Sequence, residues 1–281
     1  MKILITGING QVGHALMKQL NDHDLVGLTR QDCDLTEPDQ IRKAIDQHQP
    51  DLIINPAAYT KVDQAEDEPE LAFQINRDAP KVMAEKAREY DIPFIHFSTD
   101  YVFDGEKKGA YKEDDPTNPL GVYGASKWAG EEAIQHVGGK FYIFRTSWVY
   151  SDIGHNFYLT MKRLGENRDE IRVVSDQFGV PTSSYFIAKH TQNIIKQLSS
   201  KNTGIYHLVP DGYCSWYRFA KFILGNTPAF NAANINPIST EEYPTKAKRP
   251  INTVLNNSYV KEVFMLEFDS WQISMQDDMK K

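Results

Sequence analysis

Thr6-Gly7-Ile8-Asn9-Gly10-Gln11-Val12-Gly13 follows a short apolar run, Lys2–Thr6, and opens a segment of helical periodicity. Gly7 permits a tight turn, Gly10 lets the backbone approach a pyrophosphate, and Gly13 lets the helix pack closely on the strand. A bound phosphate would face the unpaired N–H groups and the positive end of that helix. Turn glycines also occur where nothing binds, but this spacing between a strand and a helix predicts a dinucleotide site. Its residues are expected to be Gly7, Asn9, Gly10, Gln11, Val12 and Gly13.

The rest of the first half repeats the alternation of strand and helix. Short apolar runs predict strands at Lys2–Thr6, Asp24–Thr29, Asp51–Asn55, Pro93–Ser98 and Phe141–Thr146. Helical periodicity lies between them, at Gln11–Leu20, Pro38–Gln47, Glu70–Tyr90 and Tyr123–Val137. Pro80 is expected to split or kink the third of these helices. This alternation predicts an α/β fold built on a Rossmann-like, doubly wound parallel sheet.

The second half has a different rhythm. Asn156–Gly165 and Tyr185–Leu198 are typical of helices, Gly204–Leu208 is typical of a short strand, and the pattern becomes irregular from Tyr213 onward. We expect a smaller, mixed α/β C-terminal lobe that binds substrate and closes over the carboxyl ends of the sheet. The predicted division gives residues 1–150 and 184–210 to the dinucleotide-binding domain, and residues 151–183 and 211–281 to the substrate lobe.

Composition excludes several classes of protein. The 281 residues are 41% hydrophobic and carry a formal net charge of −7, so we expect neither a nucleic-acid binder nor an anionic-membrane binder. No window is apolar over the roughly 20 residues that a membrane helix needs. Cys33 and Cys214 are too few for a disulfide framework or a cysteine-based metal site. These features favour a soluble, reduced, cytoplasmic protein with no bound metal.

The end of the second predicted strand bears on the choice of cofactor. A carboxylate there would bind the adenosine ribose and favour NAD, whereas Arg30 offers a fork for the 2′-phosphate of NADP. A solvated surface arginine is the alternative interpretation. Asp34 and Leu35 are expected near the adenine. The sequence therefore favours NADPH without excluding NADH.

A second group of residues suits the reduction of a carbonyl. Thr99 follows the fourth predicted strand, while Tyr123 and Lys127 lie one helical turn apart at the start of the next helix. Adding hydride to a carbonyl needs a proton and hydrogen-bond donors for the oxygen. Tyr123 can supply the proton, and a nearby Lys127 cation would bring its pKa down from the usual value of about 10. Lys127 could also hold the nicotinamide ribose, with Thr99 donating to the substrate oxygen.

The Tyr-x-x-x-Lys pair and the histidines also have structural interpretations. Tyr-x-x-x-Lys is common by chance, and it gains weight here only beside the glycine turn and a hydroxyl residue at a strand end. His96 and His155 have no partner at ligand spacing and are expected to be structural. A Gly-x-Ser-x-Gly motif is absent, which weakens a hydrolase interpretation.

Several blocks extend the pattern over most of the chain. They are Gly7–Gly13, Asn55–Asp63, Ser98–Gly105, Tyr123–Lys127, Arg145–Tyr150 and Gly179–Thr182. Together they resemble the extended short-chain dehydrogenase/reductase superfamily, and within it the dTDP-4-dehydrorhamnose reductases. The resemblance implies a catalytic triad of Thr99, Tyr123 and Lys127, and further cofactor contacts from Ala58, Tyr59 and Thr60. It implies substrate contacts from Thr60, Val62, Thr99, Asp100, Tyr101, Tyr123 and Trp148.

The same resemblance implies the reaction, which is the NADPH-dependent reduction of dTDP-4-dehydro-β-L-rhamnose to dTDP-L-rhamnose for surface polysaccharide. A dTDP-deoxysugar is then the partner, and the chain is expected to be a monomer or a homodimer. Some relatives pair through magnesium held by glutamates, one of them early in the first helix. His14-Ala15 stand there in this chain, so magnesium is doubtful.

The sequence leaves open the function, the role of Trp148 and the place of Arg249-Pro250. A nucleotide-sugar epimerase or dehydratase of the same superfamily is one rival interpretation. A non-catalytic protein similar to the regulatory subunit of methionine adenosyltransferase is another. Trp148 is either a core aromatic or a substrate contact, and Arg249-Pro250 is either part of a substrate loop or a surface pair.

Overall fold

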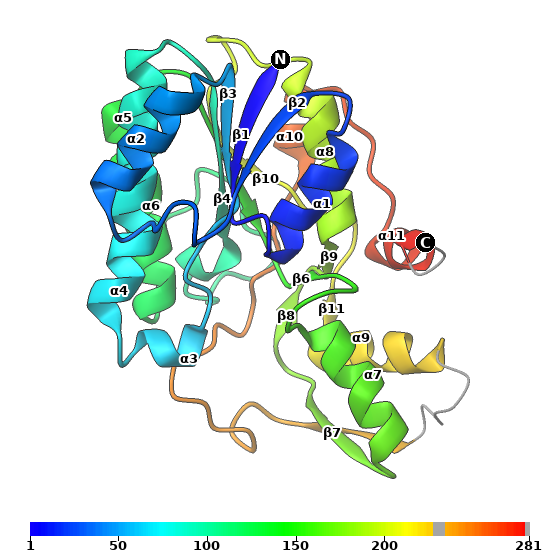
Figure 1. Ribbon diagram of the computed structural model, residues 1–281. Coiled ribbons are helices and arrows are strands. Elements are labelled where there is room, and N and C mark those ends of the chain that lie inside the picture. The colour runs from blue at the N-terminus through cyan, green and yellow to red at the C-terminus, as the bar shows by residue number, and fades with distance from the viewer. Residues whose placement is uncertain (227–233, 279–281) are drawn as a thin grey trace.

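A parallel sheet of six strands forms the centre of the molecule (Figure 1). The structure, a computed structural model, describes residues 1–226 and 234–278. The strand order is β10-β5-β4-β3-β1-β2, and every adjacent pair is parallel. The strands are β1 (Lys2–Thr6), β2 (Asp24–Leu28), β3 (Leu52–Asn55), β4 (Phe94–Thr99), β5 (Phe141–Thr146) and β10 (Gly204–His207). The parallel sheet follows from the continuous apolar runs, which suit strands buried on both faces.

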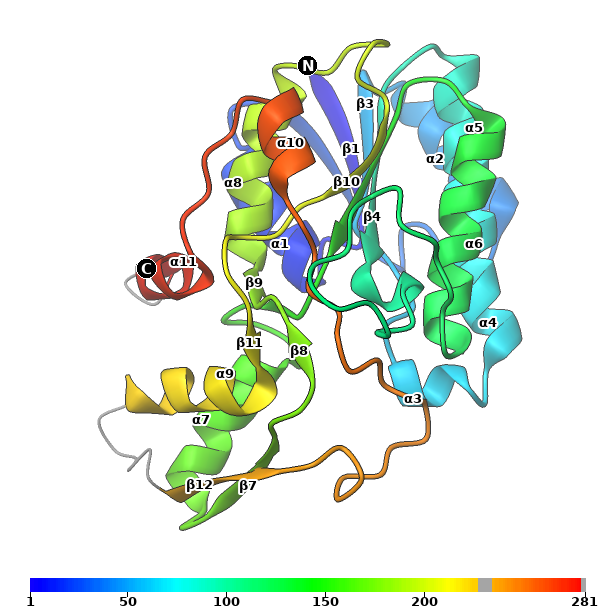
Figure 2. The ribbon, with the colours of Figure 1, turned by 180° about the vertical axis from the view of Figure 1, so that it is seen from behind.

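Helices cover both faces of this sheet (Figures 1 and 2). One face carries α1 (Gln11–Gln19), α8 (Ser184–Ile195) and α10 (Ser258–Val263), and the other carries α2 (Pro38–His48), α5 (Ala79–Glu89) and α6 (Val122–Val137). Successive strand residues contribute to different cores: Ile3 and Ile5 pack with Leu16 and Ile187, while Leu4 packs on the opposite face. The predicted doubly wound α/β fold is confirmed.

The segment predicted as one helix, Glu70–Tyr90, is divided differently from our expectation. It consists of α4 (Pro69–Phe73), a π-helical turn η1 (Gln74–Asp78) and α5, and the short helix α3 (Val62–Ala65) precedes it. Pro80 does not break the helical path, because it lies at the start of α5, directly after the π-helical turn, and Asp78 and Ala79 before it keep helical dihedrals. The irregularity comes instead from the wide turn around Asn76.

A smaller lobe lies beyond the carboxyl ends of the strands (Figure 1). Its main elements are α7 (Phe157–Asn167), α9 (Trp216–Gly225) and the parallel pair β7 (Ile171–Val174) and β12 (Ile235–Ile238). Two short pairs join it to the sheet, β6 (Val149–Tyr150) with β9 (Thr182–Ser183), and β8 (Phe178–Gly179) with β11 (Cys214–Ser215). A core that includes Tyr158, Phe219 and Trp271 fills the lobe, and α11 (Trp271–Asp278) closes it.

The C-terminal region is shared between the two halves, which differs from the predicted division. Val260, Phe264 and Phe268 pack in the same core as Ile3 and Ile5 of β1. Residues 258–268 therefore cover the sheet, although the sequence pattern assigned all of 211–281 to the lobe. The irregular sequence pattern after Tyr213 does not indicate this packing, because the packing partners lie at the other end of the chain. Among the described residues, no helix is both long and apolar enough to cross a membrane.

Candidate active site

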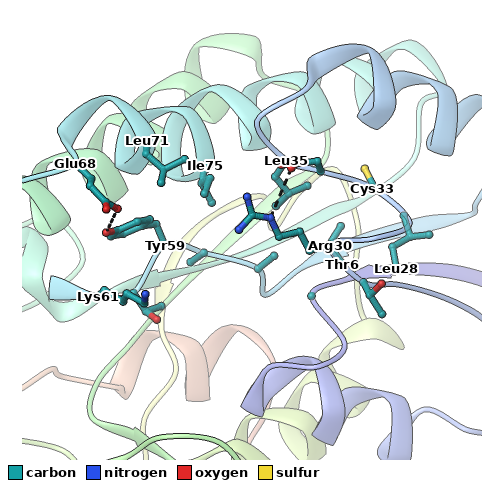
Figure 3. Close-up of a pocket in the computed structure, with 16 residues that line it drawn as sticks. Thr6, Leu28, Arg30, Cys33, Leu35, Tyr59, Lys61, Glu68, Leu71 and Ile75 are labelled. Atoms are coloured by element: carbon teal, nitrogen blue, oxygen red, sulfur yellow. Dashed lines mark hydrogen bonds and ion pairs between the residues drawn. The ribbon is translucent and has the colours of Figure 1, made fainter. Parts of the chain in front are cut away.

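The carboxyl ends of β1 and β3 flank the point where the strand order changes direction. Chains leaving such neighbouring strands run to opposite faces and open a crevice, where ligands bind in α/β sheets. A cavity of about 330 Å³ lies there. Figure 3 shows side chains from both sides of it, with Arg30 between Tyr59 and Cys33. Seven of the predicted cofactor residues line it, namely Gly7, Arg30, Asp34, Leu35, Ala58, Tyr59 and Thr60.

The glycine turn has the close packing that its sequence predicts. Gly7 has a φ of +60°, and Gly10 donates its N–H to Gly7 O at 2.9 Å. A Cβ atom at Gly13 would lie 2.4 Å from Gly7 O, so only glycine lets α1 start this close to the turn. No side chain caps α1, and its first turn holds no acidic residue. The first N–H groups of the helix are thus free for a phosphate, and this cradle fits a dinucleotide.

The predicted residues Asn9, Gln11 and Val12 have separate surroundings in this turn. Asn9 is exposed, and Val12 packs on the core beneath α1. Gln11 Oε1 accepts hydrogen bonds from Ser151 Oγ and Asn156 Nδ2, both at 2.9 Å. The first residue of the helix therefore holds the start of the smaller lobe.

The adenosine end of the cavity combines apolar walls with one movable cation. Leu28, Leu35 and Ile75 supply apolar surface. The Arg30 side chain is 77% exposed, and its Nε lies 3.6 Å from Asp34 Oδ2. An exposed ion pair of this kind is weak, so the guanidinium is available to a phosphate. The donor set fits NADP at this end.

A residue that the sequence analysis missed fixes the far wall of the cavity. Asn76, in the π-helical turn, accepts the Tyr59 N–H at 2.8 Å and donates to Tyr59 O at 3.1 Å. It also donates to Ser126 Oγ at 3.0 Å. The Tyr59 hydroxyl donates to Glu68 at 2.7 Å (Figure 3). No local sequence signal marks Asn76, because its partners lie 17 and 50 residues away.

Thr99 and Tyr123 come together at the carboxyl end of β4. Burial raises the pKa of Tyr123 to about 12, although the nearby Thr99 hydroxyl favours the phenolate and opposes the shift. The Tyr101 ring lies edge-on to the Tyr123 ring, with the centroids 5.8 Å apart. Tyr123 is therefore a protonated phenol at neutral pH, which suits a proton donor.

Lys127 lies one turn along the same face, as its spacing predicts, but its ammonium has other partners. Nζ donates to Phe97 O at 2.7 Å and lies 3.2 Å from His96 Nε2. The side chain is 1% exposed, and this burial lowers the pKa of Lys127 to about 7, with the Glu131 charge opposing the shift. The direction expected for the pKa of Tyr123 thus differs from that found here, because burial outweighs any effect of the lysine.

Asp100 is a buried carboxyl group beside the triad. Thr99 Oγ1 donates to its Oδ1 and Ser147 Oγ donates to its Oδ2, both at 3.0 Å. Burial raises the pKa of Asp100 to about 6, although hydrogen bonds from Thr253, Ser147 and Thr99 oppose the shift. Because Thr253 comes from the C-terminal region, Asp100 links β4, β5 and that region. Ser147 and Thr253 were not predicted.

The predicted substrate residues Val62 and Tyr101 line a narrow cavity with Tyr123 and the segment 247–250. Arg249, left open by the sequence, lies beside it. Its Nη2 donates to Asp63 at 2.8 Å, and its guanidinium is 5.9 Å from the Tyr101 ring. Its buried Nη1 has no hydrogen-bond partner in the part of the chain that the structure describes. Arg249 therefore belongs to a loop over the site rather than to a surface pair.

Trp148 lies two residues beyond β5 and has a φ of +47°. Its indole stacks on Trp216 with the ring centroids 3.5 Å apart. A Cβ atom at Gly179 would lie 2.5 Å from this indole, so the glycine makes room for it. The structure thus places the half-buried Trp148 in the packing of the lobe core, beside Trp216 and Phe219.

The remaining candidates add no metal site. Among residues 1–226 and 234–278, no group of three or more histidine, cysteine or acidic side chains is placed to hold a metal ion. Cys33 and Cys214 are both buried free thiols. His96, expected to be structural, is fully buried and contacts Lys127.

Comparisons with known proteins show the family of the chain. The model of the family described as RmlD substrate binding domain matches residues 1–281. A dTDP-4-dehydrorhamnose reductase of Burkholderia thailandensis is 40% identical, over 98% of this chain and 97% of that protein. A crystal structure of dTDP-4-dehydrorhamnose reductase from Bacillus anthracis in complex with NADP has a TM-score of 0.94 at 35% identity, over 99% of this chain and 98% of that one. The corresponding structure from Clostridium acetobutylicum has a TM-score of 0.93 at 39% identity, over 100% and 99%. The chain belongs to the RmlD substrate-binding-domain family.

Proposed function

We propose that the protein reduces dTDP-4-dehydro-β-L-rhamnose to dTDP-L-rhamnose with NADPH. The observation that carries this proposal is the meeting of Thr99 and Tyr123, with Lys127 one turn along, in a molecule that also has a cavity whose glycine turn and Arg30 fit NADP. Relatives that bear the name of this reductase cover 98% and 99% of the chain, and one of them was crystallised with NADP. NADH would bind less well, because it has no 2′-phosphate for Arg30.

When bound, NADPH supplies the hydride for the sugar carbonyl. Tyr123 donates its phenolic proton to the carbonyl oxygen as negative charge develops there, so that ketone, hydride and proton give the alcohol. Thr99 donates a hydrogen bond to the same oxygen or to the phenolate that remains. Lys127 holds the nicotinamide ribose and stabilises the phenolate. These are our assignments for the triad.

The substrate would enter from the side of the smaller lobe. Thr60, Val62, Asp100, Tyr101 and Trp148 are the proposed contacts to the deoxysugar nucleotide. The unpaired Nη1 of Arg249 is a donor suited to an anion, and the diphosphate of a nucleotide sugar is the anion that a guanidinium fork binds well.

The test is consumption of NADPH against a panel of 4-keto deoxysugar nucleotides, with NADH in parallel. We expect net oxidation of NADPH with dTDP-4-dehydro-L-rhamnose. The Tyr123→Phe variant should lose at least about a hundredfold in kcat, because a general acid contributes 10²–10⁴-fold. NADPH affinity, measured by fluorescence titration, should stay close to that of the unchanged protein.

Other outcomes would point elsewhere. An epimerase or dehydratase recycles its cofactor, so interconversion of sugar nucleotides without net NADPH consumption would contradict the reductase. Copurification of a methionine adenosyltransferase, together with no sugar-dependent oxidation, would favour a regulatory protein. Full turnover by Tyr123→Phe would remove Tyr123 from its proposed role.

We also propose that the enzyme is a cytoplasmic monomer or homodimer that needs no magnesium. Light scattering after size exclusion should give the mass of one or two chains, with and without a chelator. A larger assembly, or a loss of mass or activity in the chelator, would contradict this. Following the packing of Val260 and Phe264, we assign residues 1–150, 184–210 and 258–268 to the dinucleotide-binding unit.

A further inference from the structure

A row of buried polar side chains crosses three strands of the sheet and ends at Lys127. Thr6 ends β1, Asn55 ends β3, and His96 lies in β4 in register with Asn55. The Thr6 hydroxyl donates to Asn55 Oδ1 at 2.5 Å, and Asn55 Nδ2 lies 3.1 Å from His96 Nδ1. His96 Nε2 then lies 3.2 Å from Lys127 Nζ. All four side chains are at most 2% exposed.

This row is polar, whereas the rest of the sheet face that carries it is apolar. Two residues earlier on each strand, the side chains are Leu4, Ile53 and Phe94, which belong to the apolar core under α5 and α6. Polar groups at such depth cost free energy unless each finds a partner. Thr6 also lines the dinucleotide cavity. The row therefore connects the wall of the cavity to the lysine through hydrogen bonds alone.

The donors and acceptors of the row can be counted for each charge state of Lys127. A neutral amine can accept a hydrogen bond from Nε2–H of His96, and Nδ1 then accepts from the Asn55 amide, as the structure has it. An ammonium only donates, so Nε2 must be bare and the ring proton must lie on Nδ1. The Asn55 amide then turns its oxygen to the ring and its NH₂ to Thr6. Both arrangements satisfy the contacts along the row.

We propose that His96 is a positioning residue for Lys127. It fixes the Nζ atom and, by moving its proton from one ring nitrogen to the other, lets the lysine gain or lose a proton without leaving a buried group unpaired. Phe97 O accepts from Nζ in both states and holds the side chain in place. The catalytic consequence rests on the proposed reductase activity, whereas the exchange of the ring proton does not.

The charged and titratable groups around Lys127 are few. His96 faces it from β4, and Tyr123 and Glu131 lie one turn away on either side along α6. Glu131 is paired with Arg145 of β5 at 2.7 Å, which offsets its charge. His96 stays neutral, because burial and the Lys127 charge hold its pKa well below the usual range. The proton that titrates in this cluster near neutral pH is thus the one on Lys127.

The first test is nuclear magnetic resonance of the full chain with isotope-labelled histidine and no cofactor, titrated from about pH 6 to 9. The His96 signals, identified by their absence in His96→Gln, should change from the Nδ1–H tautomer to the Nε2–H tautomer as pH rises. The change should be centred near the pKa of Lys127, which is about 7. In Lys127→Met one tautomer should persist. A single tautomer throughout in the unchanged protein, or the same change in Lys127→Met, would overturn the proposal.

The second test is the pH profile of kcat in two variants. His96→Leu removes the acceptor for the buried ammonium, so the pKa of Lys127 should fall further, and the basic limb should move about one unit towards acid. Above that limb, kcat should be about tenfold lower. His96→Gln supplies an amide oxygen to Nζ and should keep the limb within about 0.3 units of its original place. If His96 had only a structural role, both variants would be less stable, and the basic limb of the kcat profile would stay in place in each of them.

His190→Leu is the matched control, since His190 is also buried and lies on α8, away from Lys127. It should lose stability without any shift of the limb. An unmoved limb in folded, NADPH-binding His96→Leu contradicts the proposal, and if that variant does not fold, the titration of the unchanged protein decides. Absence of turnover with every sugar nucleotide would reject the proposed function, while the tautomer titration, which needs no substrate, would still test the role of His96.

Discussion

Arg30 and Lys127, two cations of the candidate site, are held in opposite ways. The Arg30 side chain is 77% exposed and has one long ion pair to Asp34, so it can turn towards a ligand at little cost. Lys127 is 1% exposed, and its Nζ contacts a backbone carbonyl and a neutral ring. The first arrangement suits recognition of a phosphate by a movable fork. The second suits a charge whose position relative to Tyr123 has to stay constant during the reaction.

Replacing Arg30 tests the cofactor preference. In Arg30→Ala we expect KM for NADPH to rise about tenfold, because one charge-assisted contact of about 1.4 kcal/mol is lost. KM for NADH should change by less than about twofold. Arg42→Ala is the control, since Arg42 is a half-exposed arginine paired with Glu85 that does not line the cavity. Equal losses for the two cofactors would show that Arg30 does not read the 2′-phosphate.

Site residues that are related by short spacing along the chain can be predicted from the sequence. Contacts that depend on the register of neighbouring strands cannot. The glycine turn is visible because Gly7, Gly10 and Gly13 follow one another between a strand and a helix. The row from Thr6 to His96 is invisible, because its members lie 49 and 41 residues apart and meet only when three strands align. The spacing of Tyr123 and Lys127 predicts their shared face, but not that Nζ bonds Phe97 O.

At the scale of elements, α6 brings the catalytic groups and their support into contact. Its face towards the sheet carries Tyr123 and Lys127, and two glycines allow neighbouring backbone to come close. A Cβ atom at Gly124 would lie 2.2 Å from Tyr101 O, and one at Gly130 would lie 2.1 Å from Asn76 O. The helix thus packs directly on the loop with the substrate residues and on the turn that holds Tyr59.

Gly130→Ala should separate α6 from the π-helical turn. The added methyl group cannot fit against Asn76 O, so we expect a loss of about 3 kcal/mol in the free energy of unfolding. NADPH binding should weaken too, because Asn76 positions Tyr59. Urea unfolding and a fluorescence titration measure both effects. The control is Gly225→Ala on α9, where no atom of the described residues lies within 4 Å of the added carbon, and where we expect a change of less than about 1 kcal/mol. Equal behaviour of the two variants would contradict this account.

The same helix shows where element prediction succeeds. α6 and the strand Phe141–Thr146 appear from their periodicity, since both bury one continuous surface. The segment Glu70–Tyr90 also has helical periodicity, but that pattern cannot show the wide turn at Gln74–Asp78. The turn depends on two residues of α6, which lies outside this segment. Gly130 leaves room for Asn76 O, and Ser126 accepts a hydrogen bond from the Asn76 amide.

At the scale of the whole molecule, buried histidines govern the response to acid. Burial holds the pKa of His190 at about 4, that of His207 at about 3 and that of His96 well below its usual range. Each is depressed below the unfolded value, so the unfolded state binds more protons once the pH falls below about 6.5, and stability is lost from there downward. Asp100 opposes this trend, because its raised pKa of about 6 makes the folded state take up a proton.

We expect a net loss of about 4 kcal/mol in the free energy of unfolding between about pH 6.5 and 5. Urea unfolding at several pH values measures it. His190→Gln should reduce the net loss by about two fifths, because each histidine contributes about 1.6 kcal/mol and Asp100 offsets part of the sum. A stability that does not change over this range would show that these rings gain their protons in the folded state.

At this scale, the elements that could be predicted lie in the first half of the chain, and the packing that could not be predicted joins its two ends. The five strands of residues 2–146 follow from their apolar runs, and the fold class with them. The packing of residues 258–268 escaped prediction because Phe264 and Phe268 find their partners in β1, at the opposite end of the chain. A pattern read in short windows cannot pair such distant residues.

This late packing affects how the protein is made. By the time a ribosome has released residue 150, the glycine turn, Arg30, Thr99, Tyr123 and Lys127 have all been synthesised. The face of β1 that carries Ile3 and Ile5 then has α1 but still lacks α8 and residues 258–268, so the core on that face is incomplete. A growing polypeptide can therefore carry every motif for its cofactor and still be unable to retain it. Binding competence should arise only when nearly the entire chain has emerged.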